Sequence, residues 1–182
     1  EGGDELGYHE VRSGRLARGY TGDAVDAVLT AGYEDREQDP SVYWVPAADL
    51  PDDLVSIDLG DDGFSQSEVF EMRANIDWSL ANDYKFTSIT GYKTFEFDYL
   101  EDYDGGPTHV NDYRQKNDVD YYSQEFRIVS PSDRKITWFA GASAYKEKID
   151  GFFEFIYDED DLCRAVGISD APDFEGPVAG CD

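Results

Sequence analysis

The sequence predicts an all-β fold: an antiparallel meander of about six long strands from a transmembrane β-barrel, with long extracellular loops. Three observations predict it. Polar and apolar residues alternate with a period of two over several long runs, short turn-forming segments join these runs in pairs, and long polar segments separate the pairs. A soluble sandwich has no need of long loops at every second connection, whereas outer-membrane barrels have short periplasmic turns and long extracellular loops.

Composition narrows the class of protein. The 182 residues include 15 Lys and Arg against 41 Asp and Glu, which gives a formal net charge of −26. Such an acidic chain repels nucleic-acid phosphates and cannot make a polybasic contact with anionic lipid. Disordered acidic chains are poor in aromatic residues, but here Phe, Trp and Tyr make up 15% of the chain. We therefore expect β-structure with long hydrated loops and no nucleic-acid partner.

The clearest alternation lies between Phe70 and Leu80, where every even position is apolar and every odd position is polar. This period places the apolar side chains on one face of a strand. The polar residues 81–83 form a turn, and a second run rich in Tyr, Phe, Thr and Ile follows over 84–99. The two runs predict a hairpin over about 66–100.

Two further hairpins are predicted. The first covers about 12–33, with a turn at 21–23, and the second covers about 119–148, with a turn at 131–134. In the second hairpin Trp138 begins a face of small apolar residues that continues through the alanines at 140, 142 and 144.

The remaining segments predict three long loops, over about 35–65, 102–118 and 149–182. Trp78 and Trp138 lie near short turns, where a barrel carries an aromatic girdle. Taken alone they could be ordinary residues of a sheet core, but the alternation of turns and loops favours the girdle. A soluble lipocalin-like barrel is disfavoured, because it would have eight strands and mostly short loops.

Several stretches then resemble one family. The sequences YKFTSITGY at 84–92 and DYLEDYDG at 98–105, followed by SQEFRIVSP at 123–131 and WFAG at 138–141, are similar to the barrel of TonB-dependent receptors in type, order and separation. The resemblance implies the outer membrane of a Gram-negative bacterium. It implies energised uptake of a scarce nutrient, such as a siderophore, cobalamin or a glycan, and it leaves the substrate open.

The chain also departs from this family. Such receptors have a plug domain, a motif that engages TonB, and a barrel of about 22 strands, whereas this sequence shows no recognisable plug and about six strands. We therefore expect residues 1–182 to be a partial barrel, a fragment whose partners are outer-membrane lipid, the remainder of the barrel and plug, and the TonB complex through parts absent here. The alternative is a β-rich structural or interaction fragment that self-assembles through its strand edges.

No set of residues predicts an enzyme. His9 and His109 are the histidines of the chain, and neither has a Cys or Ser at a catalytic spacing. The sequence contains neither a metalloprotease motif nor a phosphate-binding glycine loop. We expect no catalytic residues and no organic cofactor.

Acidic loop residues are weak candidates for a calcium site. Hard cations such as Ca²⁺ bind several oxygen ligands, and carboxylates cluster in two of the expected loops without EF-hand spacing. The competing interpretation is solvated loop charge. The calcium candidates are Asp102, Asp104, Asp158 and Asp160.

Cysteines and aromatic residues of the expected loops are candidates for a disulfide and for ligand binding. Cys163 and Cys181 are close in the sequence, so in an exported chain we expect a disulfide, with two unrelated thiols as the alternative. Tyr43, Trp44 and Tyr103 are aromatic loop residues that could stack on a ligand. They could equally pack the loops together.

Overall fold

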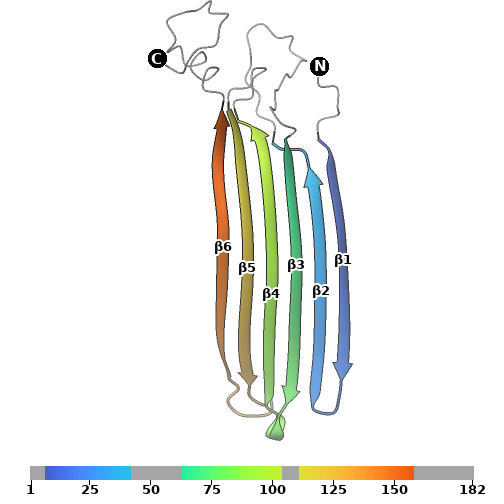
Figure 1. Cartoon of the computed structure of the whole chain (residues 1–182). Coiled ribbons are helices and arrows are strands. Elements are labelled where there is room, and N and C mark those ends of the chain that lie inside the picture. The colour runs from blue at the N-terminus through green and yellow to red at the C-terminus, as the bar shows by residue number, and fades with distance from the viewer. Residues whose placement is uncertain (1–6, 42–62, 104–110, 158–182) are drawn as a thin grey trace, which may run out of the picture.

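The computed structural model describes residues 7–41, 63–103 and 111–157, which form one antiparallel sheet. Each of six strands is hydrogen-bonded to the next one along the chain, so their spatial order is their sequence order (Figure 1). The described residues contain no α-helix. The predicted all-β meander of six long strands is therefore confirmed. The strands are β1 (His9–Thr21), β2 (Val25–Gln38), β3 (Phe64–Ser79), β4 (Lys85–Asp102), β5 (Asn111–Val129) and β6 (Phe139–Tyr157).

Three short connections lie at one end of the sheet, the lower end in Figure 1. The β3–β4 connection is a single 3₁₀ turn, η1 (Ala81–Asp83), in which Asn82 and Asp83 both have a φ of 62°. Asn and Asp adopt this left-handed conformation more readily than other non-glycine residues. The turn is closed by the Leu80 amide, which donates to the Tyr84 carbonyl oxygen over 2.8 Å. We call this end of the sheet the turn end, and the opposite end the loop end.

The strands are longer than the sequence predicted, and all three expected loops need correction. β2 continues to Gln38 and β3 begins at Phe64, so both enter the expected loop over about 35–65. β5 begins at Asn111, inside the expected loop over 102–118, and β6 continues to Tyr157, inside the expected loop over 149–182. Residues 111–118 place polar side chains on both faces, so no hydrophobic alternation marks them as a strand. The β4–β5 connection consequently covers only 103–110, and short and long connections alternate less strictly than expected.

Strand pairing runs without interruption along all five pairs, so the residues that lie directly opposite each other share one face. Face A consists of the even-numbered residues of β1 and β3–β6 and the odd-numbered residues of β2. Face B consists of the remaining strand residues. The predicted apolar positions of the three hairpins all fall on face A.

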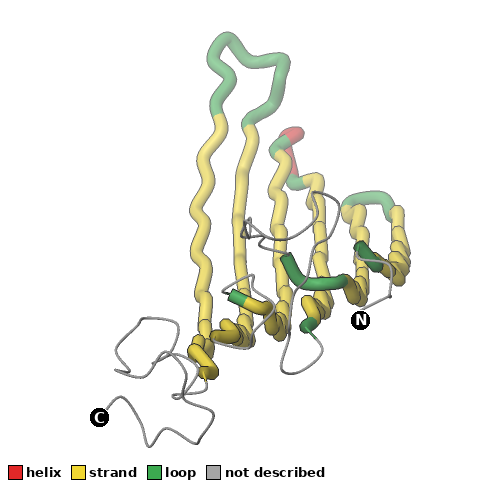
Figure 2. The backbone as a smooth tube through the Cα atoms, turned by 90° about the horizontal axis from the view of Figure 1, so that it is seen from above, coloured by secondary structure: helices red, strands yellow, loops and turns green. Residues whose placement is uncertain are grey.

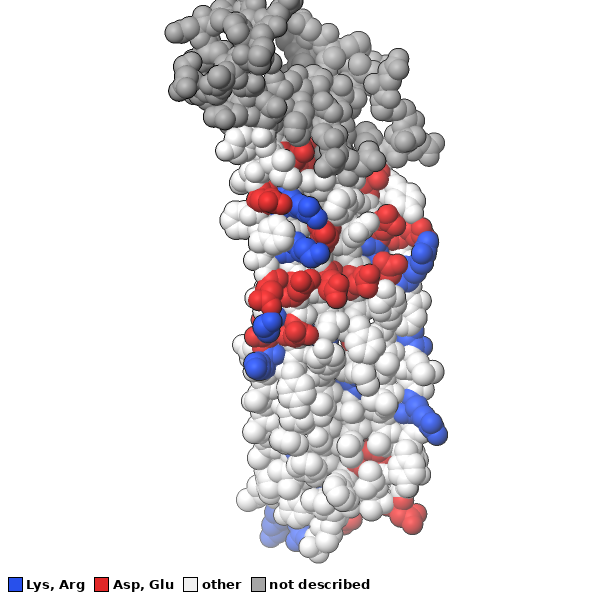
Figure 3. All heavy atoms as spheres, in the orientation of Figure 1, with Lys and Arg blue, Asp and Glu red and all other residues white. Residues whose placement is uncertain are grey.

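Face A has two zones. An apolar band covers the turn end of this face. An acidic row crosses the face nearer the loop end, where each of five neighbouring strands has one carboxylate directly opposite the carboxylate of the adjacent strand. Figure 3 shows this row crossing the sheet above a surface with few charges. The band includes Leu29, Ala31, Tyr33, Phe70, Met72, Ala74, Ile76, Trp78, Phe86, Phe126, Ile128, Ala140 and Ala142. The acidic row is Asp35, Glu68, Glu96, Asp118 and Asp150.

The described residues form a single twisted layer (Figure 2). Among them Leu100 is the one hydrophobic residue that is buried, at 5% exposure, while many large apolar side chains on face A stay exposed. The sheet therefore has no hydrophobic core of its own, and its apolar band has no covering layer within the described part of the chain. None of the helical structure described is long and apolar enough to cross a membrane.

Candidate functional site

Aromatic side chains gather on face B at the loop end of the sheet. Phe95, Phe97 and Tyr99 alternate along β4 and therefore project from the same face. Their rings are nearly parallel, with centroids 6.1 Å apart for the first pair and 5.8 Å apart for the second. The strand thus carries a ladder of three aromatic rings.

The ladder continues across β5 and β6. Tyr113 on β5 lies 6.4 Å from Tyr99 and 5.4 Å from Phe155, measured between ring centroids. Phe153 on β6 lies 6.5 Å from Tyr113, and Tyr103 lies 5.4 Å from Phe155. Such tilted and edge-to-face pairs favour each other electrostatically, by about 0.5–1.5 kcal/mol beyond the burial of their surface.

Two amide side chains lie between these aromatic groups. On face B of β5, Asn117 is opposite Phe97 of β4 and Gly151 of β6. A Cβ atom at Gly151 would lie 2.4 Å from the Asn117 side-chain oxygen, so the amide occupies the space that the glycine leaves open. The absence of a side chain at Gly151 therefore leaves room for the Asn117 amide.

Gln115 occupies the next position of face B along β5. It lies opposite Tyr99 of β4 and Phe153 of β6, and its Oε1 accepts a hydrogen bond of 3.2 Å from the Tyr113 hydroxyl. Gln115 is thus flanked by aromatic rings on both neighbouring strands, whereas Asn117 has an aromatic neighbour on β4 and a glycine on β6. The aromatic–amide patch consists of Phe97, Tyr99, Gln115, Asn117, Phe153 and Phe155.

Carboxylates surround the loop end of the patch, beyond the apolar band. The Tyr99 hydroxyl donates a hydrogen bond to Glu101, which is buried. Burial raises the pKa of Glu101, and the neighbouring charge of Asp102 raises it further. Burial and the hydrogen bond to Glu101 raise the pKa of Tyr99. Asp102 and Asp112, both buried, lie directly opposite each other on face A.

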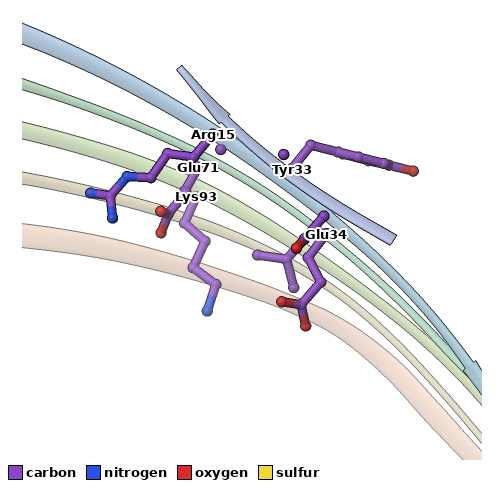
Figure 4. Close-up of a pocket in the computed structure, with 9 residues that line it drawn as sticks. Arg15, Tyr33, Glu34, Glu71 and Lys93 are labelled. Carbon is purple, nitrogen blue, oxygen red and sulfur yellow. The ribbon is translucent and has the colours of Figure 1, made fainter. Parts of the chain in front are cut away.

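A second, more polar region of face B lies over β1–β4. There a hollow of about 450 Å³ is lined by charges of both signs, among them Arg15, Glu34, Glu71 and Lys93. Figure 4 shows these four side chains on one side of the sheet, with Tyr33 directed to the other side. This part of face B therefore suits water or a polar protein surface.

The structure describes only some of the predicted site residues. Asp102 ends β4, and Tyr103 joins the aromatic cluster through Tyr113 and Phe155. Among the described residues no group of three or more His, Cys, Asp and Glu side chains could hold a metal ion. The calcium site and the disulfide therefore stay predictions. The residues outside the described ranges are Tyr43, Trp44, Asp104, His109, Asp158, Asp160, Cys163 and Cys181.

Sequence reasoning did not find the aromatic–amide patch. Its members come from three strands, and one of these strands was expected to begin only after Gln115 and Asn117. A signal was nevertheless present, because aromatic residues recur at alternate positions in 95–99 and again at 153 and 155. Alternate aromatic residues on two strands that share a neighbour point to one shared face.

Comparison of the chain with protein-family models, with curated proteins and with solved structures finds no match. Function is therefore inferred from the two faces of the sheet and from the chemistry of the aromatic–amide patch.

Proposed function

We propose that this chain is part of a TonB-dependent outer-membrane receptor for the energised uptake of a scarce nutrient. One observation carries the membrane part of the proposal: face A combines an apolar band with an acidic row, and face B is polar over the same part of the sheet. An antiparallel strand that separates lipid from an aqueous lumen needs these two faces. The sequence motifs that resemble the receptor barrel supply the choice of family.

The dimensions of the apolar band support this assignment. On β3 the band extends from Trp78 to Phe70, and Glu68 follows in the acidic row. With a rise of about 3.3 Å per residue and a tilt of about 40°, this run covers about 20 Å along the membrane normal. The lipid-facing band of outer-membrane barrels is about 25 Å tall. The acidic row would then lie at the headgroups, where water and counterions solvate it.

Aromatic residues at the turn end support the same orientation. Trp78 and Trp138 are both about half exposed, and the Trp138 ring lies 5.9 Å from the Tyr84 ring. Trp and Tyr concentrate at membrane interfaces because one part of the side chain is apolar and the other forms hydrogen bonds. The turn end would be the periplasmic end, with the loop end outside the cell.

The sheet edges explain why further strands are proposed. The outer edges of β1 and β6 are unpaired within the described part of the chain. In lipid each unsatisfied backbone group costs several kcal/mol, so only a closed barrel satisfies them. The charged hollow beside Arg15 and Glu71 would face the lumen and the plug.

Depth-dependent fluorescence quenching tests the membrane assignment. The complete receptor that contains the chain is folded into phospholipid vesicles whose lipids carry bromine at defined acyl positions. A single Trp replaces Leu29 on face A or Val28 on face B, with the natural tryptophans changed to Phe. Bromine near the bilayer centre is expected to quench Trp at 29 strongly and Trp at 28 weakly. Equal quenching of the two variants would refute the assignment.

The receptor assignment has a separate test. The gene that encodes the chain is expected to encode a plug domain upstream and further alternating strands downstream. A gene that ends at Asp182 and lacks a plug would contradict it. In the host, removal of TonB is expected to abolish uptake of the receptor's substrate while leaving the barrel in the outer membrane.

A second candidate function is self-assembly through strand edges. It is favoured by β6, which is exposed along its whole length and carries Phe139, Tyr145 and Phe153 on one face. Such an edge can add a strand from another copy of the chain. Sedimentation and electron microscopy of the detergent-free chain separate the two proposals. Ordered filaments or a defined soluble oligomer would favour assembly, whereas dependence on detergent would favour the membrane.

A further inference from the structure

We propose that the aromatic–amide patch binds an uncharged oligosaccharide, with sugar rings stacked on Phe97, Tyr99 and Phe153 and sugar hydroxyls bonded to Gln115 and Asn117. This inference rests on the proposed function and names the class of nutrient: a neutral glycan, in preference to an anionic metal chelate.

The aromatic groups provide stacking surfaces in an extended arrangement. The ladder on β4 and the rings on β6 lie on either side of β5, so aromatic groups flank the central strand over several residues. The face of a pyranose ring presents several polarised C–H bonds, which the negative face of an aromatic ring attracts. A compact ligand would use one or two of these rings. A chain of sugar rings can use all of them.

The amides provide directional hydrogen bonds. Each side-chain amide has a donor group and an acceptor group in one plane, which together can pair with two neighbouring hydroxyls. Within the described ranges the Asn117 side chain makes no hydrogen bond, and Gln115 uses only its oxygen, with Tyr113. Both amides therefore keep NH₂ donors for a ligand.

The charges near the patch argue against an anionic ligand. Glu101 adjoins Tyr99 on the same face of β4, and the acidic pair Asp102 and Asp112 lies close behind. The nearest described cations on face B are Arg36, which lies two strands from Phe97 in the same row, and Lys93, whose Nζ lies 6.0 Å from the Phe95 centroid. Arg36 is already paired with Glu34 over 3.0 Å. A ferric catecholate or a phosphate would meet repulsion without a compensating positive charge.

A cationic ligand is also disfavoured. Aromatic faces attract cations most strongly where the site is desolvated, and the Phe153 ring is 70% exposed. Glu101 is buried and accepts the Tyr99 hydrogen bond, so its oxygens are not available to pair directly with a ligand cation, although its charge still acts on the patch at longer range. Neutral amides form the centre of the patch. A neutral ligand that is rich in hydroxyls matches this combination best.

The test uses the complete receptor that contains the chain, in detergent micelles. The probes are neutral hexasaccharides of glucose, xylose, mannose and N-acetylglucosamine, with hexagalacturonate and ferric tris-catecholate as anionic probes. Binding is measured by calorimetry. Saturation-transfer NMR from protein aromatic protons then reports which sugar protons contact the rings. We expect at least one neutral hexasaccharide to bind, with its C–H protons receiving the strongest transfer.

Matched variants locate the site. Phe153→Ala removes a ring that is 70% exposed on face B, and Phe152→Ala removes its neighbour, 48% exposed on face A. Asn117→Ala removes an amide of the patch, and Asn75→Ala removes a face-B amide near the turn end. F153A removes a stacking surface and N117A removes hydrogen-bonding groups, so we expect each to weaken binding about tenfold, which is about 1.4 kcal/mol. The two control variants should change it less than twofold.

Three results would overturn the inference: no neutral hexasaccharide binds, an anionic probe binds more tightly, or the control variants weaken binding as much as the patch variants. If lipid quenching distinguishes positions 28 and 29 but sugars fail to bind, the substrate class is wrong and the membrane proposal stands. If quenching does not distinguish them, the proposed function fails, whatever the sugar result. Circular dichroism checks that each variant is folded. If F153A does not fold, N117A, which removes no ring, tests the site in its place.

Discussion

The hydroxyl of Tyr99 donates a hydrogen bond to the carboxylate of Glu101, two residues further along the same face of β4. This bond favours the ionised carboxylate, but burial has the larger effect and raises the Glu101 pKa. The loop end of the sheet therefore contains an acid that is more easily protonated in the folded state than in the unfolded state.

A pH dependence of stability follows. The pKa of Glu101 is higher in the folded state than in the unfolded state. Its contribution to the free energy of unfolding is therefore fully present below the pKa of the unfolded state and is lost as the pH rises through the pKa of the folded state. We expect the urea midpoint of the chain in micelles to fall over this range. Glu101→Gln should flatten that fall. Glu125→Gln, which changes the same charge far from the patch, should leave it unchanged, and equal effects would contradict the assignment.

The two faces of β2 are expected to differ in how much stability a buried charge costs. Leu29 and Val28 are neighbours with similar exposure, 48% and 46%, but they lie on face A and face B. In phospholipid vesicles Leu29→Lys is expected to lower the free energy of unfolding by about 2–4 kcal/mol, because a lysine near the bilayer centre loses its hydration. Val28→Lys should cost much less. Similar losses for both would rule out lipid on face A alone.

The acidic row predicts a stabilising change. Glu96 lies directly between Glu68 and Asp118, and like charges opposite each other on a sheet destabilise it. Glu96→Gln is therefore expected to raise the free energy of unfolding by about 0.2–1 kcal/mol at low ionic strength. The gain should shrink in 1 M salt as the repulsion is screened.

Glu71→Gln is the matched control for that change. Glu71 lies on face B opposite Lys93, so its neutralisation removes an attraction, and we expect a small loss of stability. Chemical unfolding at two salt concentrations measures both variants. A gain for Glu71→Gln equal to that for Glu96→Gln would show that net charge, and not the row, controls stability.

Substitution of two strand glycines by alanine is expected to change the free energy of unfolding in opposite directions. A Cβ atom at Gly141 would lie 2.8 Å from the backbone carbonyl oxygen of Phe126, and a Cβ atom at Gly14 would have nothing within 4 Å. Gly141→Ala is expected to cost about 1–3 kcal/mol, because backbone must move to admit the methyl group. Gly14→Ala should gain about 0.5–1 kcal/mol, since alanine loses less conformational freedom in a strand. Denaturant titration of both variants checks the order.

The sequence predicted much of this fold because one face carries a strong periodic signal. Phe70 to Leu80 alternates cleanly, and the structure pairs that strand as expected. The start of β5 could not be predicted in the same way, because Asp112 and Arg114 on face A alternate with Tyr113 and Gln115 on face B, and both faces are polar there. A period of two is visible only where the two faces differ in polarity.

The aromatic–amide patch illustrates a different limit. Asn117 and Gly151 are far apart in the sequence, and nothing local connects an amide with the glycine that makes room for it. Only the register of β5 against β6 brings them together. A site assembled from several strands can be predicted only when the pairing of the strands is known, whereas the strands themselves can be predicted from the sequence.

The uninterrupted register of the strand pairs limits how the lengths of the strands can change in evolution. Each strand pair proceeds residue by residue without a bulge, so a single inserted or deleted residue within a strand would exchange its two faces from that point onward. Apolar residues of face A such as Met72 would then lie on face B. Natural length variation in related chains should therefore be confined to the connections, and any tolerated change inside a strand should come in pairs of residues.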